Sequence, residues 1–240
     1  MPAYNAGRYI ASVLDRIPGP VRERLRSVWI VDDGSTDDTA ARIGQAAAAD
    51  ARVRPLSHQR NRGYGAAMKT LLSHARSEPV TAVACIHADG QYAPEELPRL
   101  LDQMRARGLD LLQGSRHASD TALAGGMPLY KYLAGHVLTT MENVVFRMKM
   151  TDYHSGYMVY GRRALDHITF DALSDSFDFD LEAIASARSG GLRVGEAAIP
   201  THYGDEVSYL NPVTYGLRVL RVMVRYVAGH YRFRTEGAGQ

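Results

Sequence analysis

The stretch VACIHADGQYAPEEL (residues 83–97) begins as an apolar run and ends in polar side chains and a proline-led segment. The runs VWIVDDGS (28–35) and LDLLQGSR (109–116) have the same form. They alternate with longer segments of helical spacing, such as APEELPRLLDQMRARG (93–108). This alternation predicts an α/β fold in which helices flank a mostly parallel sheet.

The composition is typical of a folded globular protein. With 240 residues, 45% of them hydrophobic, and a formal net charge of +2, the chain is long enough for one large α/β core or two small ones. The single cysteine, Cys85, rules out an intramolecular disulfide and does not support a cysteine-based zinc site, so we expect a reducing, cytoplasmic environment. No stretch reaches the roughly 18 to 20 apolar residues of a membrane span, and the amino end lacks the pattern of a signal peptide.

Polar side chains gather at the carboxyl ends of the expected strands, where open α/β sheets bind their ligands. Carboxylate and amide oxygens are usual ligands of Mg²⁺ or Mn²⁺, and Asp89 and Gln91 are the candidates. If residues 87–91 are extended, the side chains of His87, Asp89 and Gln91 can point into one cleft. The alternative is a turn in which Asp89 bonds backbone amides and Pro94 begins a helix.

Two further fragments each allow a binding and a structural interpretation. In IVDDGSTDDTA (30–40), the paired Asp32 and Asp33 are suited to the base and ribose of a nucleotide, although Asp and Ser also cap helices. In NRGYGAAMKTLL (61–72), glycines permit a close backbone approach, and the amide end of the following helix can face a phosphate.

The amino end raises a separate question. MPAYNAG (1–7) has the character of a loop that follows a strand, but no strand precedes it here. We therefore expect the first strand to be missing or truncated, with a stretch of chain upstream.

Six motifs occur in a fixed order: PAYNAG (2–7), VDDGSTDDT (31–39), RNRGYGAA (60–67), HADGQYAPEEL (87–97), GSR (114–116) and DYHSGYMVYGRRAL (152–165). Together they resemble the family 2 glycosyltransferases of the GT-A fold, and most of all the polyprenyl-phosphate or dolichol-phosphate mannosyl- and glucosyltransferase branch. The resemblance covers residues 1–210. It implies a Rossmann-like nucleotide-binding half (1–117) and an acceptor half (118–210), followed by a basic amphipathic helix and tail (211–240).

The resemblance also assigns a donor site. It implies that a UDP- or GDP-linked sugar is held by Pro2, Tyr4, Asn5, Asp32, Asp33, Gly65, His87 and Asp89. The branch usually reads D-x-D-x-Q in the HADGQ motif, so His87 replaces the first acid, while Asp89 and Gln91 match as metal ligands. Imidazole is a poorer ligand for Mg²⁺ than for Mn²⁺, so this change favours Mn²⁺ or weakens metal binding. A second departure, Ala6 where the mannosyl branch commonly has Glu, leaves guanine and uracil both open.

Other matched positions concern the phosphates and the acceptor. Arg116 and Lys131 are implied to face phosphate groups, with a solvated surface charge as the alternative for each. Asp152 matches a position near the sugar, and Ser155 of the same motif is assigned to the acceptor. His202, in a loop (201–212) that closes over the substrates in relatives, is assigned there too. The neighbouring His154 is as consistent with a structural role.

The resemblance implies inversion of the anomeric centre by direct displacement, with the departing nucleoside diphosphate stabilised by the metal and basic residues. A hydroxyl acceptor needs a base, whereas a lipid phosphate is already an anion and needs only positioning. In SDSFDFDLE (174–182), the pattern that ends in Glu182 matches the polyprenyl-phosphate branch, and Asp180 lies where hydroxyl-acceptor relatives keep their base. Acids at a helix start also favour the helix dipole, an alternative that applies above all to Asp178.

The carboxyl-terminal stretch (211–234) carries several arginines among apolar residues and no acid: Arg218, Arg221, Arg225, Arg232 and Arg234. Such a helix suits an anionic membrane surface, where a lipid-phosphate acceptor is reached, and predicts peripheral contact with the inner face of the membrane. Docking on the core and a dimer contact are the alternatives, and the oligomeric state stays open. No recognised nucleic-acid motif accompanies the arginines, so we do not expect nucleic acid as a partner.

These observations favour an inverting, metal-dependent transfer of a sugar from a nucleotide to a polyprenyl phosphate. Three alternatives remain: the same transfer to a glycan or small-molecule hydroxyl, a nucleotidyltransferase reaction that releases pyrophosphate, and a non-catalytic sugar-nucleotide-binding protein. The last is motivated by His87 and by the abrupt start at Met1.

Overall fold

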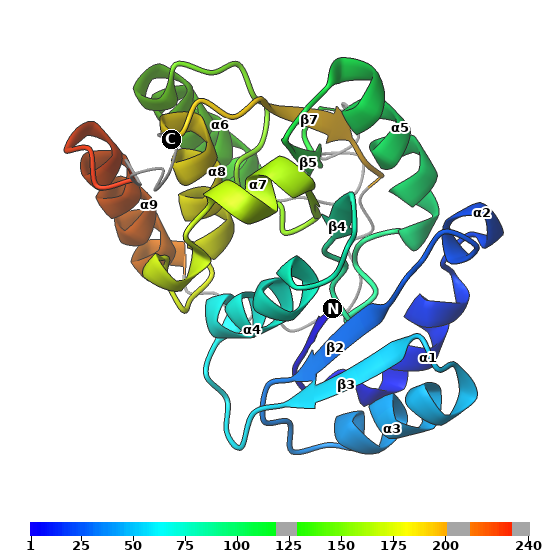
Figure 1. The fold of residues 1–240 in the computed structure, drawn as a ribbon. Helices are drawn as coiled ribbons and strands as arrows, with labels where there is room; N and C mark the ends of the chain where they lie inside the picture. The colour runs from blue at the N-terminus through cyan, green and yellow to red at the C-terminus, as the bar shows by residue number, and fades with distance from the viewer. Residues whose placement is uncertain (119–128, 201–211, 232–240) are drawn as a thin grey trace, which may run out of the picture.

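The computed structural model describes residues 1–118, 129–200 and 212–231, with backbone alone for 129–134, 212 and 213. These residues form two sheets (Figure 1). The first has the strand order β1 (Pro2–Ala3), β2 (Val28–Asp32), β3 (Val53–Ser57), and the second has the order β4 (Ala82–Ala84), β6 (Met158–Gly161), β5 (Leu111–Ser115), β7 (Val194–Ala198).

The strands run mostly parallel. Only β6 is antiparallel, to both β4 and β5, so β4 and β5 share one direction. The three apolar runs of the sequence become β2, β4 and β5. The amide of Ala88 donates to the carbonyl of Pro2 (3.3 Å), and this bond joins the two sheets just after β4. The predicted α/β fold with a mostly parallel sheet is confirmed.

Helices fill the connections between the strands. They are α1 (Gly7–Asp15), α2 (Gly19–Arg22), α3 (Thr39–Ala49), α4 (Tyr64–Arg76), α5 (Leu97–Arg107), α6 (Leu129–Phe146), α7 (Arg162–His167), α8 (Phe179–Ser189) and α9 (Pro212–Val227). Two short 3-10 turns, η1 (Pro94–Glu96) and η2 (Phe170–Ala172), precede α5 and α8.

The first sheet is covered on both faces. Ile30 of β2 packs with Ile10 of α1 and Ile43 of α3, whereas its neighbour Val31 packs with Met68 of α4. Successive side chains of a strand point to opposite faces, which explains why one strand contributes to two clusters. In Figure 1, α4 lies on one side of this sheet and α1 and α3 lie on the other.

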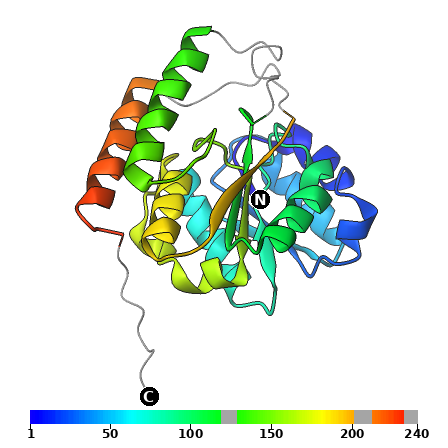
Figure 2. The same cartoon turned by 90° about the horizontal axis from the view of Figure 1, so that it is seen from above.

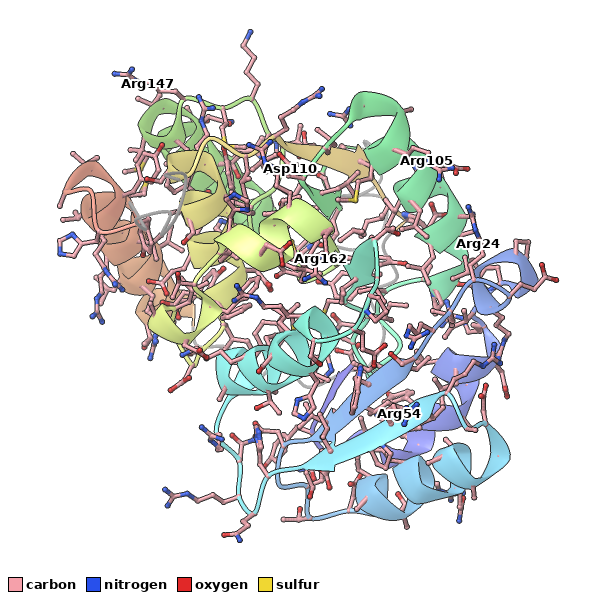
Figure 3. All side chains as sticks on the ribbon, in the orientation of Figure 1. Arg24, Arg54, Arg105, Asp110, Arg147 and Arg162 are labelled. Carbon is pink, nitrogen blue, oxygen red and sulfur yellow. The ribbon has the colours of Figure 1, made fainter. Side chains whose placement is uncertain are left out.

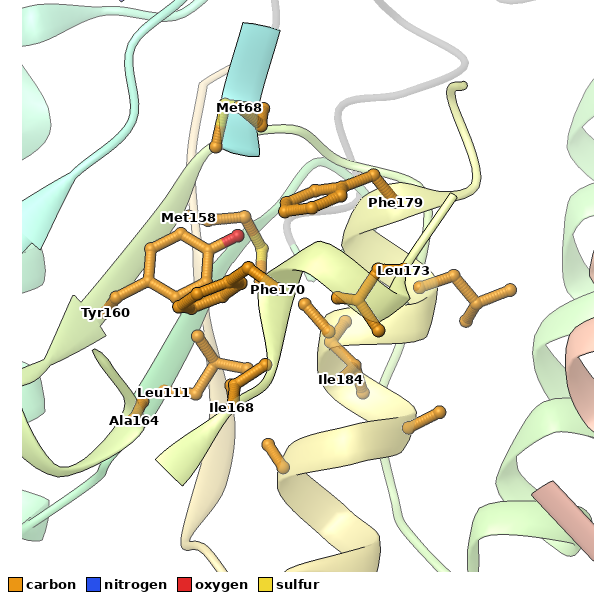
Figure 4. Close-up of a cluster of buried hydrophobic side chains, with 14 of the residues drawn as sticks. Met68, Leu111, Met158, Tyr160, Ala164, Ile168, Phe170, Leu173, Phe179 and Ile184 are labelled. Carbon is orange, nitrogen blue, oxygen red and sulfur yellow. The ribbon is translucent and has the colours of Figure 1, made fainter. Parts of the chain in front are cut away.

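The largest cluster lies between the second sheet and α8. Tyr160 of β6 meets Phe170 edge to face, with ring centroids 5.7 Å apart, and Phe179 at the start of α8 packs beside them (Figure 4). Buried aromatic rings of this size contribute a large share of the hydrophobic stabilisation. The start of α8 is therefore held firmly against β6.

The helices α6 and α9 lie side by side and pack on α8, at the opposite end of the molecule from α1 and α3 (Figure 2). The predicted carboxyl-terminal amphipathic helix is therefore present as α9. No helix in the described ranges has the length and apolar character that a bilayer crossing requires. The division of the chain at residues 117 and 210 stays a prediction.

The amino-terminal strand is only two residues long. Met1 donates its amino group to the carbonyl of Trp29 (2.8 Å), and Val31 donates back to the carbonyl of Met1 (3.1 Å). Beyond this point β2 and β4 are separated by a cavity of about 890 Å³, whose apolar lining includes Val83 and Met104. The two sheets therefore meet at the amino end, where residues 1–3 pair with β2 and Pro2 accepts the amide of Ala88.

Charged side chains are spread over the molecule as drawn in Figure 3. The labelled arginines, which include Arg54 of β3, Arg105 of α5 and Arg162 of α7, lie on different elements. The expectation that nucleic acid is not a partner stays a prediction.

Candidate active site

The loop after β2 is held by hydrogen bonds from backbone amides to the two buried aspartates. Asp32 Oδ1 accepts the amide of Ser35 (2.9 Å). Asp33 Oδ1 accepts the amide of Arg62 (3.0 Å), and its Oδ2 accepts the amide of Gly63 (2.9 Å). His58 Nδ1 also lies 2.6 Å from Asp33 Oδ1. Asp33 is therefore committed to holding the loop before α4, and Asp32 is the member of the pair with fewer protein contacts.

Residues 2–5 run beside this loop. Asn5 has a positive φ of 49°, a conformation that asparagine tolerates better than most residues. Its Oδ1 accepts the amide of Thr36 (2.9 Å), while its own amide donates to Ser35 Oγ (2.9 Å). Pro2 is buried in β1, and Tyr4 is 39% exposed. The structure thus brings the predicted nucleotide-binding residues of β1 and β2 together, although the Asn5 side chain is used to join two loops.

The glycines before and within α4 have a packing role. A Cβ on Gly65 would lie 2.2 Å from the carbonyl oxygen of Ser174, and one on Gly63 would lie 2.5 Å from that of Asp175. The amides of Gly65 and Ala66 both donate to the carbonyl of Asp175 (3.0 and 3.3 Å). A protein carbonyl already accepts the hydrogens of these two amides, so the expectation that this helix end faces a phosphate stays a prediction that the contacts do not favour.

The HADGQ motif also differs from the extended strand considered above. Strand β4 ends at Ala84, residues 88–89 form a turn, and Gly90 has a positive φ of 78°. Asp89 Oδ1 accepts the amide of Gln91 (3.0 Å), which is the turn interpretation of this motif. Because residues 88–89 form a turn, the side chains of residues 87, 89 and 91 do not point the same way as they would along an extended strand.

The side chain of His87 packs inward from this turn. Its Nε2 lies 3.2 Å from the hydroxyl of Tyr64, and its ring meets Tyr92 edge to face. A Cβ on Gly156 would lie 2.5 Å from the imidazole, so the glycine of the HSGY motif makes room for this ring. Burial lowers the pKa of His87 below its usual value, against the opposing effect of Asp89. The side chain at the first position of the motif is thus a neutral, packed imidazole.

The residues after β4 fit a divalent cation that is bound largely through substrate. No group of three His, Cys, Asp or Glu side chains among the described residues is arranged to hold a metal ion. Asp89 is half-buried at the strand end and offers hard carboxylate oxygens. Mg²⁺ and Mn²⁺ are often held by one or two carboxylates, with phosphate oxygens and waters completing the shell. The side-chain oxygens of Asp89 and Gln91 therefore fit the protein's share of such a site in chemical type.

Asp180 lies in the core, beneath the end of β4. It is 5% exposed; its Oδ2 accepts the hydroxyl of Tyr64 (2.6 Å) and its Oδ1 accepts the hydroxyl of Tyr160 (3.3 Å). Burial raises the pKa of Asp180 to about 7, although the two hydroxyls act in the opposite direction. Tyr64 thereby connects Asp180 to His87.

The predictions made from the sequence include no role for Tyr64 or Tyr160. Tyr64 stands within the quoted NRGYGAA motif, between the two glycines, so a signal for it existed. Tyr160 lies in an ordinary apolar strand, where nothing distinguishes its hydroxyl from that of any other buried tyrosine.

At the end of β5, Arg116 pairs with Asp152. Arg116 Nε donates to Asp152 Oδ2 (3.1 Å), and its Nη2 donates to the carbonyl of His154 (2.9 Å). Burial raises the pKa of Asp152, but Arg116 and His154 outweigh it, so the net shift is downward. The structure thus joins two residues that the sequence assigned separately to phosphate and to sugar, and it places an ionised carboxylate behind the guanidinium.

A further acid, Glu142 of α6, joins this group. It is fully buried, and its Oε2 lies 3.3 Å from His154 Nε2. The other imidazole nitrogen of His154, Nδ1, lies 3.0 Å from the hydroxyl of Tyr215 on α9. The sequence offered one signal for Glu142, a lone acid in an apolar helical stretch (137–146).

Glu182 is placed away from these groups, against α9. Its Oε1 accepts Arg225 Nη1 (2.7 Å) and the hydroxyl of Tyr231 (2.6 Å), and its Oε2 accepts the amide of Ser174 (2.5 Å). Asp178 likewise accepts Ser174 Oγ (2.8 Å) and Arg218 Nη1 (3.3 Å). These contacts account for both acids as anchors of α9. The acceptor role of Glu182 stays a prediction that its contacts do not favour.

Three acceptor-side assignments have a limited structural counterpart. Ser155 is fully buried, and its carbonyl accepts Gln113 Nε2 (2.8 Å). Lys131 lies in α6, in the part for which only the backbone is described. His202 lies outside the described residues.

A comparison of the sequence with known protein families identifies the family of this chain. The family model described as glycosyl transferase family 2 matches residues 1–169. The chain belongs to this family. It is therefore a glycosyltransferase, and the resemblance inferred from the six motifs is confirmed.

Relatives of this family 2 glycosyltransferase include several enzymes named for lipid-phosphate substrates. The polyprenol monophosphomannose synthase of Mycolicibacterium smegmatis is 28% identical over 201 residues, 83% of this chain and 74% of that one. The undecaprenyl-phosphate mannosyltransferase of Micrococcus luteus is 27% identical over 200 residues, 83% and 80% of the two chains. The low-salt glycan biosynthesis hexosyltransferase Agl6 of Haloferax volcanii is 28% identical over all of this chain, which spans 55% of its length.

Solved structures share the fold. The glucosyl-3-phosphoglycerate synthase of Mycobacterium tuberculosis, crystallised with Mn²⁺, UDP and phosphoglyceric acid, superposes with a TM-score of 0.65 at 17% identity. The match covers all of this chain and 79% of the other. At this identity the likeness supports the GT-A fold and nothing finer.

Proposed function

We propose that this family 2 glycosyltransferase moves a hexosyl group from a UDP- or GDP-linked donor to a polyprenyl phosphate, with inversion and with Mg²⁺ or Mn²⁺ as cofactor. The names of the relatives support the acceptor. The half-buried carboxylate of Asp89, an oxygen ligand of the kind that Mg²⁺ and Mn²⁺ prefer, supports the metal. The proposal assigns the nucleotide to residues of β1 and β2, led by Asp32. It assigns the diphosphate to Asp89, Gln91 and Arg116.

The contacts of Asp180 are the observation that favours a phosphate acceptor over a hydroxyl acceptor. Each of its carboxylate oxygens accepts a tyrosine hydroxyl, and the side chain is 5% exposed. A base must reach the proton that it removes, and a carboxylate enclosed in this way cannot do so without displacing Tyr64 or Tyr160. A phosphate acceptor is already an anion and needs no base, so it agrees with this geometry.

The chain's own residues then act by position and charge. Arg116 presents a guanidinium that Asp152 orients from behind, and this charge offsets the negative charge that develops on the departing diphosphate. A bound metal would supply further electrostatic stabilisation of the same leaving group. Asp180, through Tyr64, positions the imidazole of His87 beside the turn that contains Asp89.

One observation favours the hydroxyl acceptor as a second candidate. Burial raises the pKa of Asp180 to about 7, and a base whose pKa lies near the working pH is effective in proton transfer. The variant Asp180→Asn separates the candidates, because loss of a base costs on the order of 10²-fold or more in rate. Loss of a carboxylate that only positions Tyr64 changes the rate much less.

The membrane-facing part of the proposal rests on α9 and α6. Arg218 and Arg225 turn toward the buried acids Asp178 and Glu182, so the expectation that these two arginines face lipid is not supported. Both helices also expose large apolar side chains beside polar ones such as Arg221. They are Leu217, Leu220, Val224 and Val227 on α9, and Val137, Met141 and Val144 on α6. An apolar face of this kind suits the interfacial region of a bilayer, where a polyprenyl phosphate would be met.

The test of the function is a transfer assay with labelled UDP- and GDP-hexoses. Detergent-dispersed polyprenyl phosphate and a sugar alcohol serve as alternative acceptors, each with Mn²⁺, Mg²⁺ or EDTA. We expect label in the lipid, release of nucleoside diphosphate, and loss of transfer with EDTA. Label in the sugar alcohol alone would favour the second candidate, and release of pyrophosphate would indicate a nucleotidyltransferase.

Asp89→Asn tests the metal assignment within the same assay. We expect the rate to fall about 100-fold or more, because a preorganised charge at the leaving group is lost. Asp15→Asn, an exposed carboxylate at the end of α1, is the matched control and should leave the rate unchanged. An unchanged rate in Asp89→Asn would show that the metal ligands lie elsewhere.

A further inference from the structure

His154 connects the strand-end site to α6 and α9. Its backbone faces the site, because its amide donates to Asp152 Oδ1 (2.7 Å) and its carbonyl accepts Arg116 Nη2 (2.9 Å). Its imidazole faces the helices, with Nε2 3.3 Å from Glu142 Oε2 and Nδ1 3.0 Å from the hydroxyl of Tyr215. One residue thus contacts both members of the Arg116 and Asp152 pair and both helices of the apolar face.

Glu142 is the member of this group that requires an explanation. It is fully buried, and neither of its carboxylate oxygens accepts a well-aligned hydrogen bond from the described residues. Its polar contact there is the imidazole of His154 at 3.3 Å. A buried carboxylate with so little compensation is costly, and an apolar side chain of similar volume would avoid that cost. Packing alone therefore does not account for an acid at this position of α6.

We propose that Glu142, His154 and Tyr215 form a positioning triad that holds Arg116 and Asp152 in place and couples them to α6 and α9. The proposal rests on the proposed function, in which Arg116 meets the departing diphosphate. Glu142 and Tyr215 fix the two nitrogens of the imidazole, so the backbone of residue 154 keeps one orientation. That orientation sets where the guanidinium of Arg116 points.

The charges around His154 agree with this role. Burial lowers the pKa of His154, but the carboxylate of Glu142 outweighs burial, so the net shift is upward. The groups that face it are Glu142 from α6, Tyr215 from α9, and Arg116, His117 and Asp152 from the strand end. Burial also raises the pKa of Glu142, although His154 acts in the opposite direction. The triad is therefore complete where Glu142 is ionised and His154 is protonated, and it loosens as the pH rises through the pKa of His154.

Two variants remove one contact each. Glu142→Gln keeps the volume and removes the charge, and Tyr215→Phe removes one hydroxyl. The matched control is Tyr231→Phe, which also removes a hydroxyl that bonds a buried carboxylate, that of Glu182 (2.6 Å), and anchors the same end of the molecule without touching His154. All three are expected to lower the melting temperature by a few degrees.

The kinetic result separates positioning from a merely structural role. We expect kcat to fall about tenfold in Glu142→Gln and Tyr215→Phe, with KM for the donor within about threefold of the original value, because the interaction acts on leaving-group stabilisation. The basic limb of the pH profile should move to lower pH in Glu142→Gln. Tyr231→Phe should change neither quantity. Equal effects in all three variants, or an unmoved pH profile, would overturn the proposal.

A measurement without turnover keeps the triad distinct from the proposed function. Nitrogen-15 NMR of His154 and of the Arg116 Nε–H group is recorded against pH in the original protein and in Glu142→Gln. We expect His154 to titrate at lower pH in the variant, and the Arg116 Nε–H signal to lose its protection from solvent exchange. If the protein transfers no sugar, the proposed function fails while these spectra still decide the triad. An unchanged Arg116 signal would overturn the triad even if transfer were slowed.

Discussion

The carboxylates on the two sides of the site are held in different ways. On the proposed donor side, Asp33 is held by the backbone amides of residues 62 and 63 and by the imidazole of His58. On the proposed acceptor side, Asp180 is held by two tyrosine hydroxyls, whereas Glu182 is held by a tyrosine, an arginine and one backbone amide. Backbone amides keep their hydrogens at every working pH and move only with the main chain, whereas side-chain partners depend on how helices pack and on protonation. We therefore expect the surroundings of Asp33 to be the more rigid part, and those of Asp180 to be the part that pH and helix docking change more.

The largest expected effect concerns the pH dependence at Asp180. Burial raises its pKa from 3.8 to about 7, so the folded protein binds more protons than the unfolded chain between these values. The stabilisation is fully present below the lower value and is lost as the pH rises through about 7. At about 1.4 kcal/mol for each pKa unit, the change is about 4 kcal/mol.

Urea unfolding of the original protein and of Asp180→Asn at several pH values measures this effect. The difference in unfolding free energy between the two proteins should change by about 4 kcal/mol between pH 4 and pH 8. A difference that does not vary with pH would show that the acceptor side is as insensitive as the donor side.

A second substitution, Gly65→Ala, tests the rigidity of the backbone at the start of α4. Gly65→Ala places a methyl group 2.2 Å from the carbonyl oxygen of Ser174, so the start of α4 must move away from the backbone that caps it. We expect a loss of about 3 kcal/mol in unfolding free energy, measured by chemical denaturation.

The control for this substitution is Gly44→Ala in α3, where an added Cβ meets nothing within 4 Å. Alanine favours a helix interior, so this variant should gain about 1 kcal/mol. A similar loss in both variants would mean that the close approach at Gly65 does not determine the result.

The smallest effect compares two arginines of α9. Arg225→Met removes one partner of the buried carboxylate of Glu182, although Tyr231 and the amide of Ser174 remain. We expect a loss of about 2 kcal/mol, because a buried charge is left with less compensation. Arg221 is exposed, and Arg221→Met should change stability by less than about 0.5 kcal/mol.

Thermal unfolding of the two α9 variants at pH 7 is sufficient to compare them. If both lose the same stability, α9 is not anchored through Glu182, and the contrast between the two sides of the site is weaker than the contacts imply.

Parts of this protein follow from sequence alone. The alternation of apolar runs and helical segments predicts β2, β4 and β5, because strand and helix periods are local properties of the chain. The polar ends of these runs predict which edge of the sheet carries the site, since parallel strands end in the same direction. The order of six motifs was sufficient to recognise the family.

Other features depend on the packing of distant segments. Residues 87–91 form a turn because Gly90 takes a positive φ, and whether this motif is extended or turned is not visible in its composition. Gly65 of α4 permits a close approach to the carbonyl of Ser174, which is more than 100 residues away in the sequence. Arg225 donates a hydrogen bond to Glu182, from which it is separated by 43 positions. Tyr160 and Glu142 stand in ordinary apolar stretches, so their roles appear only when β6, α6 and α8 are brought together. Local sequence determines the periodicity of helices and strands and the places where strands end. The tertiary structure determines which partner a buried polar group bonds, because burial and hydrogen bonding depend on the assembled core.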